Sequence, residues 1–216
     1  MSLSRKIVLA AMAVGLVAPP LFAQSFHLGL RGGAGIPTGA FSEDAATAED
    51  ALVSGAKTGF GYGLDAGLGF GMFGVYAGFD KIDFDCETAT CTSDGKFKLA
   101  GVSAGIRLSP PGMSFIRPWI KGGVTFNELK RDYGSGASSN RLMSDRAPGY
   151  EIGAGLDIPA FGLFAITPQV RYVGQNLKYT VPGVTSPSAE PEAGVNYFTV
   201  DLGLSITNPF RSAKRR

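Results

Sequence analysis

Residues 57–85 read KTGFGYGLDAGLGFGMFGVYAGFDKIDFD, and this stretch decides the fold. Within 60–70 every second residue is apolar, and the positions between them hold glycines and one carboxylate, Asp65. After a break at Gly71 the alternation restarts and continues over 73–80. A period of two is typical of β-strands, because their successive side chains point to opposite faces. We therefore predict two strands joined by a tight turn.

The two faces of these strands differ in a way that a soluble sheet does not explain. The large apolar side chains form one continuous face, whereas the other face is small and sparsely charged. A soluble sandwich would bury the large residues and expose polar ones. The reverse arrangement, with apolar residues outside and small or polar residues inside, is typical of a barrel wall in lipid.

The same alternation recurs along the chain in about eight segments of roughly ten residues, the length that crosses a bilayer when tilted. Long polar connections alternate with short turns, as in barrels whose long loops face outward. The long connections are expected at 37–56, 85–95, 130–147 and 177–195. Lipid cannot satisfy an unpaired strand edge, so the sheet must close. We predict an all-β fold, a closed antiparallel transmembrane β-barrel with up-and-down topology.

The first 23 residues have the pattern of a secretory signal peptide. Arg5 and Lys6 precede an apolar run over 7–17, and cleavage is expected after Ala23. A helical membrane anchor would need about 20 apolar residues, and a pair of prolines ends this run too early. The predicted organisation is a signal peptide over 1–23, a barrel over 24–210 and a basic tail over 211–216. The predicted location is the bacterial outer membrane.

Charge argues against a nucleic-acid partner. The full chain has 20 basic and 18 acidic residues, and removing the signal peptide would leave 18 of each. The 31 glycines are about twice the usual share of roughly 7% and show no collagen period, so they need a structural reason.

Ten charged residues are predicted to face the lumen, five of each sign. They are Arg31, Asp65, Asp80, Arg107, Arg117, Lys121, Glu151, Asp157, Arg171 and Asp201. Side chains can fill a barrel of about eight strands, and an uncompensated buried charge costs several kcal/mol. We expect these residues to pair and plug the lumen, as Glu151 with Arg171, Arg117 with Asp157 and Arg31 with Asp201. A gated polar path for protons or small solutes is the alternative. When the strands are aligned so that these ten residues face the lumen, few leucines and phenylalanines face inward.

Other candidate chemistry is sparse. Cys86 and Cys91 flank a loop tip, and in an exported chain such a pair predicts a disulfide. Two thiolates alone do not make a metal site, so no metal or other cofactor is expected. His27 is the only histidine and lies at the start of the first strand, away from the outer rim. A Ser–His pair at that rim is therefore not available, and we expect no enzyme activity.

The mature chain resembles the small outer-membrane β-barrel family of opacity proteins, OmpX-type proteins and the OmpA transmembrane domain. The resemblance includes the phrases WIKGGV at 119–124 and TPQVRY at 167–172. It implies a non-enzymatic role in envelope structure or in adhesin-like, loop-mediated surface interaction, through the four long connections. The expected partners are outer-membrane lipids, lipopolysaccharide and the outer-membrane assembly machinery. The chain also resembles OmpW-type barrels, which implies, as the alternative, a narrow channel for small, hydrophobic solutes.

Overall fold

The computed structural model describes residues 25–42, 53–86, 95–110, 116–133, 140–180 and 192–207. These residues form nine strands and one 3-10 turn, η1 (Gly39–Phe41). The strands are β1 (Ser25–Thr38), β2 (Ala56–Phe70), β3 (Phe73–Cys86), β4 (Lys96–Leu108), β5 (Arg117–Tyr133), β6 (Asn140–Ser144), β7 (Ala147–Phe161), β8 (Phe164–Thr180) and β9 (Glu192–Thr207). Within these ranges no helix is long and apolar enough to span a membrane.

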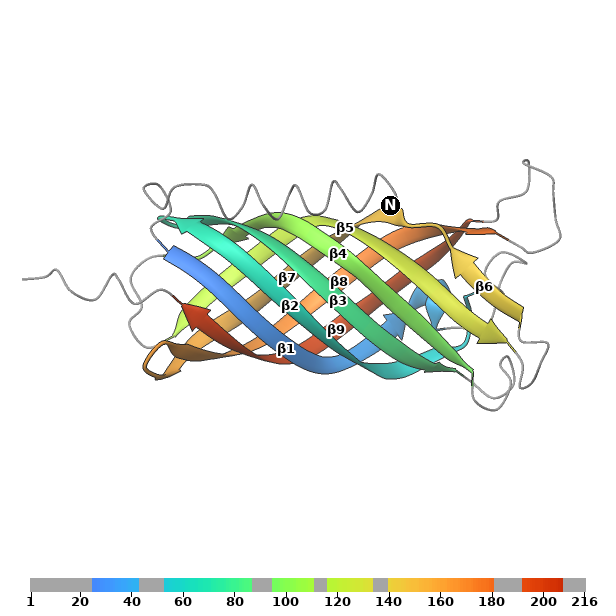
Figure 1. Cartoon of the computed structure of the whole chain (residues 1–216), viewed down its shortest axis with the longest axis horizontal. Helices are drawn as coiled ribbons and strands as arrows, with labels where there is room; N and C mark the ends of the chain where they lie inside the picture. The colour runs from blue at the N-terminus through green and yellow to red at the C-terminus, as the bar shows by residue number, and fades with distance from the viewer. Residues whose placement is uncertain are drawn as a thin grey trace, which may run out of the picture.

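The strands form one closed antiparallel barrel (Figure 1). Apart from β6 and β7, consecutive strands pair with each other, and the first strand, β1, pairs with the last, β9, to close the wall. The short β6 and the longer β7 share one position, because both pair with β5 on one side and β8 on the other. The barrel thus has eight strand positions in up-and-down order, which confirms the predicted fold.

Two glycine turns define one end of the barrel. Gly71 between β2 and β3 has a φ of +72°, and Gly162 between β7 and β8 has a φ of +56°. This left-handed backbone region favours glycine, so both hairpins can be short. The strand ends that the longer connections join, from β1 to β2 and from β3 to β4, lie at the opposite end of the barrel (Figure 1). Long and short connections therefore alternate as predicted.

The strands are longer than expected. β4 has 13 residues and β5 and β8 have 17 each, whereas roughly ten suffice to cross a bilayer. Both ends of the predicted loop at 177–195 are strand, because β8 continues to Thr180 and β9 begins at Glu192. The extra residues extend the wall past the lipid at the end with the long connections.

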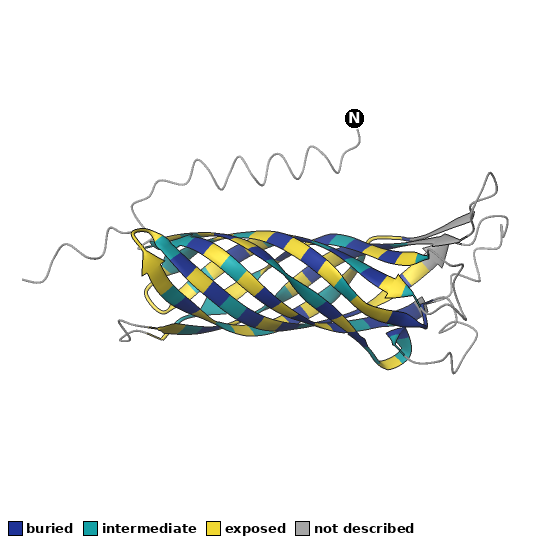
Figure 2. Ribbon diagram, turned by 90° about the horizontal axis from the view of Figure 1, so that it is seen from below, coloured by how far each residue is buried: buried dark blue, intermediate teal, exposed yellow. Residues whose placement is uncertain are grey.

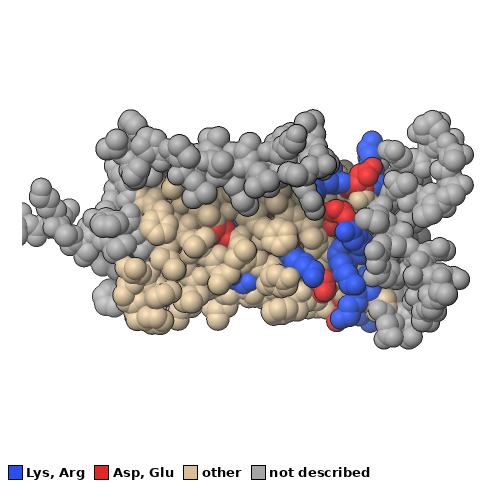
Figure 3. All heavy atoms as spheres, viewed as in Figure 1, with Lys and Arg blue, Asp and Glu red and all other residues tan. Residues whose placement is uncertain are grey.

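The outer face of the wall follows the predicted alternation (Figure 2). Phe60, Tyr62 and Leu64 on β2 and Phe73 and Val75 on β3 are all exposed. Toward the end with the long connections, the apolar wall gives way to Lys, Arg, Asp and Glu side chains (Figure 3). The wall therefore has an apolar band that fits lipid and a charged zone beside it.

Candidate functional site

Side chains fill the lumen at two levels. A network of buried charges fills the lumen from the end with the short turns to the middle of the barrel. The end with the long connections holds a cluster of apolar side chains, which we call the apolar cup. The cup consists of Phe41, Val53, Ala56, Ile82, Phe84, Phe97, Leu99, Leu129, Val173, Leu177, Ala193, Val195 and Tyr197.

Arg171 on β8 lies at the centre of the charge network. Its side chain is only 3% exposed and contacts three carboxylates from three other strands. Its guanidinium lies 3.0 Å from Asp80, 3.3 Å from Glu151 and 3.2 Å from Asp201. Thr199 Oγ1 also donates a hydrogen bond to Asp201 over 2.8 Å. One cation therefore links β3, β7, β8 and β9 through the interior.

Arg31 on β1 extends the network toward the short-turn end. Its Nη2 donates to both carboxylate oxygens of Asp80, each at 2.8 Å, and its Nη1 donates to Asp65. Asp65 in turn contacts His27 Nε2 at 2.6 Å. Asp80 is therefore shared by Arg31 and Arg171, and four residues form a continuous chain of contacts from Arg171 to Asp65.

Glu151 on β7, which contacts Arg171, also connects Lys121 and Tyr76 to the network. The Tyr76 hydroxyl donates a hydrogen bond to Glu151 over 2.6 Å. Lys121 Nζ lies 3.6 Å from the same carboxylate and 4.6 Å from the centre of the Tyr76 ring. This arrangement satisfies the buried carboxylate from several directions, as burial of a charge requires.

Asp157 organises a separate group closer to the short turns. Arg107 Nη2 lies 2.5 Å from Asp157 Oδ2, and the Trp119 indole donates to Oδ1 over 3.1 Å. The Arg107 guanidinium also lies 4.4 Å from the centre of the Trp119 ring. Thr167 on β8 adds a hydrogen bond to the carboxylate. Four strands thus meet at one acidic side chain.

The structure brings together nine of the ten predicted lumen charges. Arg117 is the exception, because it lies exposed at the start of β5. Among the described residues the lumen set therefore contains four cations and five carboxylates, where five of each were expected. His27 also contacts Asp65 in this set.

The partners within this set differ from the expected ones in two of three cases. Glu151 contacts Arg171, as predicted. Asp157, however, is contacted by Arg107 although Arg117 is its neighbour in the strand register. The predicted pairing of Arg31 with Asp201 is wrong as well, because Arg31 contacts Asp65 and Asp80. Long side chains reach across the narrow interior, so their partners need not lie on adjacent strands.

The apolar cup overturns the expectation that few leucines and phenylalanines face inward. Phe41 from η1 packs edge-on against Phe84 and Phe97, with ring centres 5.0 and 5.5 Å apart. Phe84 packs in turn against Tyr197 at 5.4 Å. The cause is strand length, since the same inward phase that holds Asp80 continues for several residues along β3. Counting that alternation to the end of the strand would have revealed the cup.

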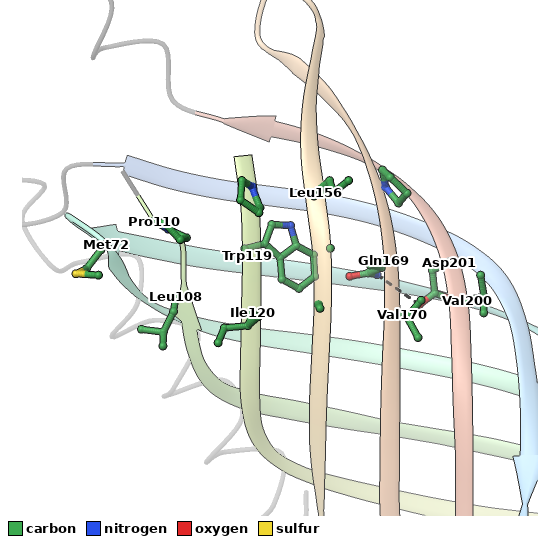
Figure 4. Close-up of a pocket in the computed structure, with 14 residues that line it drawn as sticks. Met72, Leu108, Pro110, Trp119, Ile120, Leu156, Gln169, Val170, Val200 and Asp201 are labelled. Atoms are coloured by element: carbon green, nitrogen blue, oxygen red, sulfur yellow. Dashed lines mark hydrogen bonds between the residues drawn. The ribbon is translucent and has the colours of Figure 1, made fainter. Parts of the chain in front are cut away.

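Glycines make room for the bulky lumen side chains. Trp119 lies beside β7 near Leu156 (Figure 4), at a hollow in the wall where lipid-facing side chains such as Ile120 and Val170 also line the surface. A Cβ added at Gly155 would lie 2.4 Å from Cζ2 of the Trp119 ring. Only a residue without a side chain leaves this space.

Gly155→Ala is therefore expected to lower the free energy of unfolding by about 1–3 kcal/mol, the usual cost of overpacking. Gly122→Ala on β5 is the matched control, since its nearest contact would be a backbone oxygen 3.8 Å away. Urea titration of both variants in detergent micelles, followed by fluorescence of the single tryptophan, measures the difference. Equal losses in the two variants would contradict the packing account.

The other candidate residues are placed as follows. Cys86 ends β3, and Cys91 lies outside the described residues, so their disulfide stays a prediction. His27 lies at the short-turn end of β1. In the part of the chain that the structure describes, no group of three His, Cys, Asp or Glu side chains could hold a metal ion. Sequence reasoning missed the neutral lumen partners, such as Thr199 and Gln169, which donate to Asp201.

A closed eight-position barrel with an apolar exterior and a charged interior defines a small transmembrane β-barrel protein. The sequence matches the family described as outer membrane protein beta-barrel domain over residues 7–205, and the chain belongs to that family. This membership implies the bacterial outer membrane as its location. No curated protein matches the chain.

Solved structures share the fold at low sequence identity. Neisserial surface protein A has a TM-score of 0.60 at 14% identity, over 84% of this chain and 96% of that one. Ail, the attachment invasion locus protein of Yersinia pestis, has a TM-score of 0.51 at 18% identity, over 85% and 98%. The outer membrane protein AlkL has a TM-score of 0.51 at 12% identity, over 90% and 95%.

Proposed function

We propose that this protein is a non-enzymatic, closed barrel of the outer membrane that holds surface loops on a rigid wall for envelope structure or surface interaction. The observation that carries this proposal is the double filling of the lumen, by the charge network and by the apolar cup. A transported solute would have to displace both. The work of the protein then falls to its outer rim and loops.

The network supports a mechanical role for the interior. Its charged members come from seven strands: Arg31 on β1, Asp65 on β2, Asp80 on β3, Lys121 on β5, Glu151 on β7, Arg171 on β8 and Asp201 on β9. Contacts among them join opposite sides of the wall. Buried ion pairs of this kind are costly to break, because removing one partner leaves an uncompensated charge. The wall can therefore hold the loops in fixed relative positions.

Two structural neighbours are consistent with a surface role. Ail is named as an attachment invasion locus protein, and one of its structures contains the heparin analogue sucrose octasulfate. Neisserial surface protein A is named for its location. The likeness supports the proposal by analogy of architecture only, and the loop ranges 37–56, 85–95, 130–147 and 177–195 remain the proposed contact regions.

A second candidate function follows from the apolar cup. Its members lie at the end with the long connections, and Phe41 enters it from η1 rather than from a strand. Movement of η1 would open an apolar site to the outside, which suits capture of a small hydrophobic solute. The charge network beneath the cup argues against onward passage through the lumen, so we rank this function second.

Planar bilayer recordings of the mature protein test the closed barrel. We expect no discrete openings at neutral pH, with heat-modifiable gel mobility confirming that the inserted protein is folded. Stepwise openings of the folded wild type would overturn the proposal and favour a polar path. Uptake of an apolar solute by protein-containing vesicles, in bilayers that stay electrically silent, would favour the second candidate.

A further inference from the structure

Two hairpin tips at the short-turn end of the barrel carry large apolar side chains. The first tip is residues 71–72, between β2 and β3, and the second is residues 162–163, between β7 and β8. We call them the apolar tips. Met72 is 46% exposed and Leu163 is 44% exposed, and Phe161 beside the second tip is 64% exposed. Neither tip has a charged or hydrogen-bonding side chain.

The turn geometry requires the glycines of these tips but not their apolar neighbours. Gly71 and Gly162 have positive φ and take the first position of each two-residue loop. With glycine first, the second position of such a hairpin accepts most residues, and turns in water favour polar ones. Both hairpins nevertheless have a large apolar residue there, Met72 and Leu163. Their surroundings must therefore explain the choice.

The aromatic residues of the outer wall differ between the two ends of the barrel. Toward the long connections the outward rings include Tyr62, Tyr150 and Tyr172. Their hydroxyl groups suit the boundary between hydrocarbon and water. At the short-turn end the outward rings that the structure describes are all phenylalanines, which have no polar group to place at that boundary. They are Phe26, Phe70, Phe73, Phe161 and Phe164.

Exposed charge is scarce at the short-turn end. Arg107 and Asp157 pair with each other inside the lumen. Among the residues described at this end, Arg117 is the one exposed charge. A long arginine side chain can extend from an apolar surface to the headgroups, so this residue is compatible with lipid around it.

The height of the apolar wall places the edge of the hydrocarbon at these turns. Counted from the short turns, the first outward charges on β3 and β4 are Lys81 and Lys98. They lie eight residues from Phe73 and ten residues from Leu108, where these strands meet the turns. At the usual strand tilt these lengths are roughly 20–25 Å along the barrel axis. The apolar band of such barrels is about 25 Å tall, so none of it remains to separate the tips from lipid.

We infer that the apolar tips lie in the inner leaflet of the outer membrane, in contact with the acyl chains of its phospholipids. This end of the barrel then does not project into the periplasm. The lipid contact of the tips continues that of the wall, since the rings of Phe161 and Phe164 lie 5.2 Å apart directly beside the second tip. The inference uses the outer-membrane location and does not depend on what the loops bind or on whether the lumen conducts.

The test is paramagnetic NMR of the mature protein in phospholipid nanodiscs. A nitroxide near the carbonyl end of an acyl chain reports contact with hydrocarbon, and a soluble gadolinium chelate reports contact with water. We expect the amide signals of Met72 and Leu163 to lose intensity with the lipid-bound nitroxide and to keep it with the chelate. The exposed pair Asp85 and Lys96, at the other end of β3 and β4, should show the reverse.

Two variants separate the side chains from the turn geometry. M72N/L163N should gain broadening by the chelate and lose broadening by the nitroxide, because amide side chains are costly to hold in hydrocarbon. M72L/L163M is the matched control and should keep the wild-type profile, since it preserves apolar character. Heat-modifiable gel mobility confirms that each variant is folded.

Wild-type tips that are broadened by the chelate and not by the nitroxide would overturn the inference. That result would leave the tips as an apolar surface for a soluble periplasmic protein. A folded M72N/L163N variant with the wild-type profile would also contradict it, because apolar side chains would then not be what holds the tips in lipid.

Discussion

Arg171→Met is expected to lower the free energy of unfolding by about 3–5 kcal/mol, the cost of breaking a buried ion pair from one side. Arg171 neutralises Asp80, Glu151 and Asp201 at once, and methionine fills similar volume without charge. Asp80 would keep its contacts with Arg31, but Asp201 would lose its cation. Urea titration in micelles, followed by Trp119 fluorescence, gives the free energy of unfolding.

Arg117→Met provides the control, because this arginine is exposed at the start of β5. It should change the free energy of unfolding by no more than about 0.5 kcal/mol, as surface substitutions usually do. Arg171→Lys should recover only part of the stability, because a single ammonium cannot reproduce the fork of a guanidinium. Similar losses for Arg171→Met and Arg117→Met would show that the network does not hold the wall together.

Phe84→Ala is expected to have the second large effect, a loss of about 3–5 kcal/mol in the free energy of unfolding. Phe84 is fully buried in the apolar cup and packs against Phe41 and Tyr197. Alanine would leave a cavity beside the rings of Phe41 from η1 and Tyr197 from β9. Because the cup would then be incomplete, the variant should also expose the long-connection end to proteolysis at lower urea concentration than wild type.

Phe73→Ala on the same strand is the control, because it removes a phenylalanine ring that is not packed inside the barrel. Phe73 lies at the other end of β3 and is exposed. Its removal leaves no enclosed cavity, since lipid or detergent can fill the space, and the loss should be less than half that of Phe84→Ala. If the two losses were equal, the cup would not be a packed core.

The period-two alternation along the sequence was sufficient to predict the wall of the barrel. The alternation around Asp65 showed which face is apolar, and the lipid requirement for paired edges showed that the sheet closes. The same phase placed nine of the ten predicted charges in the lumen. It failed at Arg117, because alternation assigns a face but does not say where the barrel ends. The predicted strands were also too short, so Phe84 and Leu99 were not recognised as members of the apolar cup.

Which charges meet was decided by the tertiary structure. Arg171 and Asp80 are 91 positions apart in sequence and lie on β8 and β3, yet their side chains lie 3.0 Å apart. Their contact depends on the stagger of eight strands and on the space that glycines leave, and neither appears in a period-two pattern. The sequence by itself determined the class of fold, the lipid-facing surface and most of the lumen charges. Closure of the barrel then brought distant strands within reach of each long side chain, so only the three-dimensional wall selected the partners.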